Sequence, residues 1–159
     1  MTKPSLILLS VALILVIVAY VYIANSAPLK SYGHSNYYYE DKVIIELNNK
    51  GHSNIKIMDV LVNDNKKPVE TELVVSYTGR LALAGIESDP YAKFMKINEQ
   101  PINPELSGEQ AYEILQTNEY KTPLHYGLQI VNNGEIRSVT IKYKYYGITK
   151  KARFELRTD

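Results

Sequence analysis

The strongest hydrophobic pattern of the chain lies near its first residue. Residues 5–24 read SLILLSVALILVIVAYVYIA, carry no charge, and include thirteen Leu, Ile or Val residues. A helix of this length is about 30 Å long, which matches the hydrocarbon core of a bilayer. A buried core helix explains the segment poorly, because such a helix normally shows a polar stripe. We therefore predict a transmembrane anchor at residues 5–24, preceded by a cytoplasmic tail at residues 1–4.

The residues that flank this segment favour a domain outside the cytoplasm. Lys3 and the amino terminus lie on the short tail, and basic residues are enriched on the cytoplasmic side of membrane helices. The alternative is a signal peptide cut after Ser26, because Ala24 and Ser26 supply small residues at the −3 and −1 positions. The apolar run is longer than the hydrophobic region of most signal peptides, so we favour an uncleaved single-pass anchor. Both alternatives export the rest of the chain.

Beyond the anchor, the apolar positions mostly alternate with polar ones, which is typical of strands. Residues 25–41 lack a period and are rich in turn formers, so we interpret them as a tether. Strands are expected at residues 42–48, 53–63 and 73–77. The parity of the apolar positions changes within residues 53–63, which predicts a β-bulge near Met58 and Asp59. Short strands or irregular edges are expected at residues 80–86 and 91–97.

The last forty residues show the clearest alternation. Strands are predicted at residues 126–131, 139–145 and 152–156. Asn133-Gly134 is a strong signal for a two-residue type I′ hairpin turn, and Gly147 permits the next reversal. We therefore expect three consecutive antiparallel strands to form one sheet with an exposed polar face.

One short helix is predicted between these groups of strands. Ser107 and Gln110 fit a capping box, in which each residue satisfies a backbone N–H of the other. Ala111, Ile114 and Leu115 then form a short apolar stripe. We expect a helix of about ten residues that covers an opening between two sheets.

Seven to eight short strands separated by turns predict a mainly β fold for residues 42–159, namely an antiparallel β-sandwich of immunoglobulin-like type with one short helix. In this architecture the chain resembles small membrane-anchored immunoglobulin-like modules of Gram-positive bacteria. The resemblance covers residues 42–157 and rests on the strand pattern, because the chain has neither cysteine nor tryptophan. It implies binding or assembly rather than chemistry.

Composition narrows the setting of this domain. Without cysteine the domain has no disulfides, and an exported domain of this kind suits a bacterial cell envelope. A net charge of +1 argues against nucleic-acid binding. The charge is uneven, since residues 85–119 carry seven acidic and two basic residues, whereas residues 134–159 carry seven basic and three acidic ones.

The basic segment supplies the candidate partner or ligand surface, in which tyrosines lie among cationic side chains. An anionic wall polymer, lipid headgroups or an acidic partner would suit such a surface. The plainer alternative is a solvated sheet face whose tyrosines are ordinary strand residues. The residues of the candidate surface are Lys142, Tyr143, Lys144, Tyr145, Tyr146, Lys150, Lys151 and Arg153.

Nothing in the sequence locates an active site. The three histidines, His34, His52 and His125, show no metal-ligand spacing, and no GxSxG, SxxK or phosphate-binding loop occurs. We predict no catalytic residue, no metal and no cofactor. The expected function is a non-enzymatic, membrane-anchored accessory or interaction protein that engages another envelope or membrane protein. A module that binds wall polymer or peptide is the main alternative, and an extracytoplasmic enzyme is a weaker one.

Overall fold

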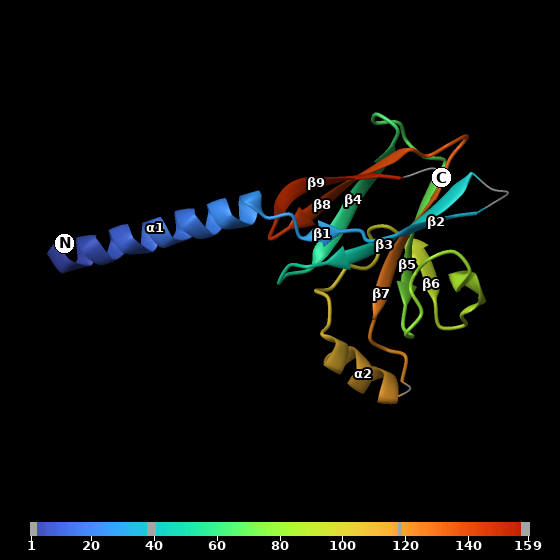
Figure 1. The fold of residues 1–159 in the computed structure, drawn as a ribbon. Coiled ribbons are helices and arrows are strands. Elements are labelled where there is room, and N and C mark those ends of the chain that lie inside the picture. Colours follow the sequence, from blue (N-terminus) through green and yellow to red (C-terminus); the bar gives the residue numbers. More distant parts are fainter. Residues whose placement is uncertain (1–2, 38–40, 118, 157–159) are drawn as a thin grey trace.

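A long helix projects from a β-rich domain (Figure 1). The computed structural model describes residues 3–37, 41–117 and 119–156, with α1 side chains from Ile7 onward. Helix α1 (Lys3–Asn25) includes a segment, Ile7–Asn25, that is long and apolar enough to span a membrane. Its Leu, Ile and Val side chains are largely exposed, because no other element covers them.

Nine strands of the described chain form two sheets in which every pair is antiparallel. The larger sheet has the order β1-β3-β7-β5-β6, and β2 also pairs with β3. The smaller sheet has the order β4-β8-β9. The larger sheet comprises β1 (Leu29–Lys30), β2 (His34–Asn36), β3 (Lys42–Asn49), β5 (Glu70–Ser76), β6 (Lys93–Lys96) and β7 (His125–Val131), and the smaller comprises β4 (Ile55–Val62), β8 (Ser138–Tyr145) and β9 (Ile148–Glu155).

One buried apolar cluster draws side chains from both sheets. Alternation along each strand places these side chains on the inward face, as the sequence predicts. The larger sheet contributes Val43, Ile45, Leu47, Leu73, Val75, Tyr126, Leu128 and Ile130, and the smaller contributes Ile55, Ile57, Val60, Val62, Val139, Ile141, Tyr143 and Tyr145.

The predicted bulge in β4 is confirmed. The register of β4 against β8 shifts between Ile57 and Asp59, so Met58 is the extra residue and is 43% exposed. The shift keeps Ile57 and Val60 buried although they differ in parity.

The interpretation of residues 25–41 as an irregular tether is wrong for two of its segments. Strand β1 pairs Leu29 with Asn49, and β2 pairs His34 with Ile45, so both segments lie along one edge of β3. Leu29 is buried in the main core. Segments this short carry too little alternation to be recognised, and their pairing is with residues far along the chain. Of the Tyr37–Tyr39 run, Tyr38 and Tyr39 lie outside the described residues.

The prediction of a hairpin at Asn133-Gly134 is also wrong. Strand β7 lies between β3 and β5 in the larger sheet, whereas β8 lies between β4 and β9 in the smaller one. The connection therefore crosses from one sheet to the other, and only Gly134 of the two residues has a positive φ, of 98°. The second reversal is confirmed: Tyr146 and Gly147, with φ of 48° and 76°, join β8 to β9.

A second apolar cluster lies on the outer face of the larger sheet. Residues 77–92 fold across this face as bends, turns and the 3-10 helix η1 (Ile86–Ser88) instead of the strand considered for residues 80–86. Ala82 and Ile86 pack there against Ile44 and Val74. Both faces of the central strands β3 and β5 are therefore buried. The strand expected within residues 91–97 does form, as β6.

Helix α2 (Gly108–Thr117) begins with the predicted capping box. The Gln110 N–H donates to Ser107 Oγ over 3.2 Å, and the Ser107 N–H donates to Gln110 Oε1 over 3.0 Å. The helix was expected to cover an opening between the two sheets, and it does not. It extends below one end of β7 (Figure 1), and none of its residues is buried. Leu115 lies near Gly79, in the turn after β5.

Candidate interaction surfaces

The eight residues of the predicted partner surface lie in three different environments: the core, the outer face of the smaller sheet, and the region around the β8–β9 turn and the end of α1. Alternation along β8 directs Tyr143 and Tyr145 into the core, where they are 1% and 4% exposed, so neither ring is available for stacking on a ligand. The side chains of Lys142, Lys144, Lys151 and Arg153 point outward from β8 and β9. Tyr146 lies exposed in the turn, and Lys150 lies against the end of α1.

The outward lysines form one cluster, which we call the lysine face: Lys56, Lys142, Lys144 and Lys151. Lys56 lies directly opposite Lys144, and Lys142 lies directly opposite Lys151. All four side chains are exposed. Lys56 was not predicted. Its position between Ile55 and Ile57 predicts that it faces outward, but the sequence does not predict that β4 pairs with β8.

The lysine face carries uncompensated positive charge. Directly opposed like charges destabilise a sheet. Within the described chain no carboxylate forms an ion pair with any of the four lysines. Asp59, opposite Lys142, pairs instead with Lys67.

Arg153 differs from these lysines because it is neutralised locally. Its Nε donates to Glu155 Oε1 over 2.6 Å, and Asp64 Oδ1 lies 3.7 Å from its guanidinium. The hydrogen bond to Glu155, with help from Asp64, raises the pKa of Arg153. The uncompensated charge therefore lies toward the β8–β9 turn, and the paired charge lies at the other end of the strands.

The β8–β9 turn contacts the end of the apolar helix. Lys150 Nζ donates to the carbonyl oxygens of Ala24 and Ser26 over 2.8 and 2.6 Å. The last carbonyls of a helix lack partners within it and carry partial negative charge, so a cation is well placed there. Ser26 Oγ also donates to the Ile23 carbonyl oxygen over 2.7 Å. The two Lys150 bonds connect the end of the helix to β9, whereas the Ser26 bond lies within the helix end itself.

Apolar and aromatic side chains surround this junction. Ile23 packs against the main core, and Tyr22 and Ile23 line a cleft of about 230 Å³ with Tyr145 and Tyr146. The rings of Tyr145 and Tyr146 meet edge to face with centroids 4.8 Å apart. Tyr145 Oη accepts the His52 N–H over 3.1 Å. The end of α1 therefore contacts the domain through the Lys150 bonds and through the packing of Ile23.

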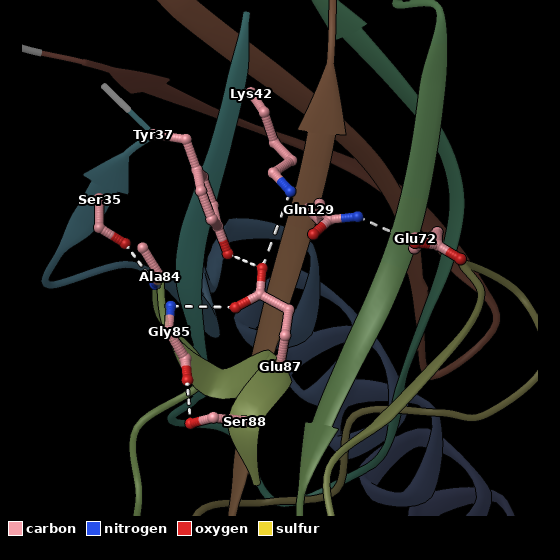
Figure 2. A network of polar contacts seen from close by, with 9 residues as sticks. All are labelled: Ser35, Tyr37, Lys42, Glu72, Ala84, Gly85, Glu87, Ser88 and Gln129. Carbon is pink, nitrogen blue, oxygen red and sulfur yellow. Dashed lines mark hydrogen bonds and ion pairs between the residues drawn. The ribbon is translucent and has the colours of Figure 1, made fainter. Parts of the chain in front are cut away.

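A polar network joins the amino-terminal segment to the loop on the outer sheet face (Figure 2). Glu87 is its centre: Tyr37 Oη and the Gly85 N–H donate to its carboxylate, and Lys42 Nζ lies 3.8 Å away. Ser35 Oγ accepts the Ala84 N–H over 2.6 Å. Because Lys42 is on β3 and Ser35 is on β2, these contacts hold the loop over the second apolar cluster.

Asp89 fixes the other end of the same loop. Its carboxylate accepts the Thr78 hydroxyl over 2.5 Å and the Tyr91 N–H over 2.9 Å, and the residue is 7% exposed. Burial by itself raises the pKa of Asp89, but the bonds from Thr78 and Tyr91, together with Arg80, outweigh it and lower the pKa.

The histidines lie on different elements. His34 is on β2, His52 precedes β4, and His125 begins β7, where burial lowers its pKa. In the described part of the chain, no three His, Cys, Asp or Glu side chains gather to hold a metal.

The nearest approach to a catalytic combination is a cleft of about 300 Å³ between β2 and β9, lined by Ser31, His34 and Glu155. In this cleft the Ser31 hydroxyl donates to the Gly33 carbonyl oxygen, and Glu155 accepts a hydrogen bond from Arg153.

Comparison with protein-family models, curated proteins and solved structures finds no match for this chain.

Proposed function

We propose that this protein is a non-enzymatic, single-pass membrane protein of a bacterial cell envelope, whose exported domain engages another envelope or membrane protein. The observation that carries the proposal is the lysine face, an exposed and unpaired group of cations on a sheet whose β8–β9 end contacts the end of an apolar helix. A charged surface held at a fixed place beside a membrane suits recognition, because charge complementarity steers partners and sets their orientation.

We further propose that the domain is a β-sandwich of immunoglobulin-like type. The strand order supports this: β1-β3-β7-β5 and β4-β8-β9, taken in chain order, match the A-B-E-D and C-F-G sheets of constant-type immunoglobulin domains. The shared core of the two sheets also fits two layers packed face to face. β2 and β6 are then additions at the edges of the first sheet.

The anchor is proposed to remain attached, with the amino terminus inside the cell. Ile23 belongs to the packing of the main core, and Lys150 binds the carbonyl oxygens of Ala24 and Ser26. A cut after Ser26 would remove the Ile23 side chain from the core. The contacts therefore favour the uncleaved form over the secreted alternative.

Edge protection alone does not explain the lysine face. Lysines on edge strands discourage unwanted strand pairing, and Lys56 and Lys151 lie on the edge strands β4 and β9. Lys142 and Lys144, however, lie on the central strand β8, which has partners on both sides.

A module for wall polymer or peptide remains the alternative function. The lysines support it, whereas the burial of Tyr143 and Tyr145 removes the stacking surface it relied on.

Photo-cross-linking in living cells tests the proposed function. A photoreactive amino acid placed at Thr149, which is exposed beside Lys144, should yield a discrete protein adduct. The same amino acid at Glu113, on the exposed side of α2, is the matched control and should yield none at comparable intensity. Adducts with wall material alone would contradict a protein partner and favour the polymer-binding alternative.

A further inference from the structure

We infer that the lysine face binds the anionic lipid headgroups of the membrane in which α1 is anchored. The inference rests on the proposed membrane anchoring and goes beyond it, because it names a lipid surface as a partner of the domain itself. Such binding requires that the cation cluster lie within reach of the headgroup phosphates.

The position of the β8–β9 turn supplies the first step. Tyr146 and Gly147 form this turn, and Tyr146 lines the same cleft as Ala19 and Tyr22 of α1. The tip of the smaller sheet therefore lies beside the last turns of the apolar helix, as Figure 1 also shows. An anchor that ends at the membrane surface brings this tip to the surface with it.

The tyrosines around the β8–β9 turn indicate where this turn lies relative to the membrane. Tyr20, Tyr22 and Tyr146 are 60%, 71% and 52% exposed, although each ring is large and mostly apolar. Tyrosine is enriched at the headgroup level of membranes, where the ring meets hydrocarbon and the hydroxyl meets water. Three exposed tyrosines at one level indicate that this level is the headgroup region.

The strand register gives the distance of each lysine from the β8–β9 turn. Lys144 lies two residues before the turn and Lys142 four residues before it, which correspond to about 7 and 14 Å along the strand. Lys56 is level with Lys144, and Lys151 is level with Lys142. An anionic surface attracts cations within about one Debye length, near 8–10 Å. Lys56 and Lys144 are inside this distance, and Lys142 and Lys151 lie a few ångströms beyond it, about the length of a lysine side chain.

The charge distribution points the same way. On β8 and β9 the outward charged residues nearest the turn are Lys142, Lys144 and Lys151, whereas Arg153 and its partner Glu155 lie farther from the turn. Asp59, which lies on β4 opposite Lys142, is paired with Lys67.

The test uses the full-length protein in vesicles, because the chain lacks cysteine and accepts a single label. A donor dye on Thr149→Cys, attached with an impermeant maleimide, reports only outward-facing domains. Energy transfer to acceptor-labelled headgroups is compared between phosphatidylcholine vesicles and vesicles that also contain phosphatidylglycerol. We expect higher transfer with phosphatidylglycerol and loss of that increase in high salt.

Two matched variants decide the role of the lysine face. Replacing its four lysines by glutamine should abolish the increase in transfer. A control variant in which four exposed lysines on other surfaces become glutamine (Lys66, Lys93, Lys96 and Lys121) should keep it. Circular dichroism confirms that both variants fold.

Equal transfer in both lipids, or an equal loss in both variants, would overturn the lipid inference. A cross-linked protein partner at Thr149 would still support the proposed function in that case, so the two failures are distinguishable.

Discussion

Reversing one charge on the lysine face should stabilise the domain. Lys151 lies directly opposite Lys142, and Lys144 is its diagonal neighbour across the β8–β9 ladder. Lys151→Glu converts a repulsive pair into an attractive one. Directly opposed charge pairs contribute roughly 0.2–1 kcal/mol, and two charges about 6 Å apart in water interact by about 0.7 kcal/mol. Removing repulsion and adding attraction would together give about 1.4 kcal/mol without salt, and screening at physiological ionic strength reduces the added stability to about 0.5–1 kcal/mol.

The assay is urea denaturation of the full-length protein in detergent micelles, followed by tyrosine fluorescence. With an m-value of about 1–3 kcal/mol/M in urea, the gain corresponds to an increase of about 0.2–1 M in the urea midpoint. The shift should shrink at 1 M salt, where the Debye length is about 3 Å.

Lys96→Glu is a control with the opposite expected sign. Lys96 lies opposite Glu72 in the pairing of β5 with β6, so the same substitution there creates a repulsive pair and should destabilise the domain. If Lys151→Glu fails to stabilise at low salt, or if its effect is unchanged at high salt, the lysine face is not electrostatically strained and the reasoning is refuted.

Two other substitutions test the junction and the outer loop. Gly51→Ala should lower the stability of the domain by about 1–3 kcal/mol, because the added Cβ would lie 2.8 Å from Tyr145 Cζ. Gly108→Ala is the control. Its added Cβ meets nothing within 4 Å, so it should not lower stability in the same urea assay. Asp89→Asn should lower stability at neutral pH. The lowered pKa of Asp89 contributes stability that is complete above its unfolded value, near 3.8, and is lost as the pH falls toward the folded value. The difference between the two proteins should therefore narrow below about pH 4, and a constant difference would contradict the role of the Asp89 carboxylate.

Local patterns in the sequence predicted local structure well. The capping box at Ser107 and Gln110, the bulge at Met58 and the Tyr146-Gly147 reversal are all present. Each depends on contacts within a few residues or on a strict two-residue period, so the sequence holds the information needed.

Predictions that depended on distant pairing failed or were incomplete. Asn133-Gly134 has the composition of a hairpin turn, but β7 is occupied on both sides by β3 and β5, and the chain must cross to the other sheet. The strands β1 and β2 exist because the edge of β3 offers them unpaired backbone groups. The Glu87 network and the role of Lys56 likewise require residues that lie far apart in the chain.

Burial also decided which of the predicted site residues are exposed. Strand alternation separated outward lysines from inward tyrosines, and this could be read from the sequence. Lys150 could not be assigned in this way, because its contact with the end of α1 depends on how the helix meets the domain.

Labelling of single cysteines in intact cells tests the central claim most directly, because the chain has no cysteine of its own. An impermeant maleimide should label Thr149→Cys in intact cells and Thr2→Cys only after permeabilisation, and both proteins should remain in the membrane fraction with the mass of the uncleaved chain. Protection of position 149 in intact cells, or release of a protein that begins at Ala27, would contradict a membrane-anchored domain that presents the lysine face outside the cell.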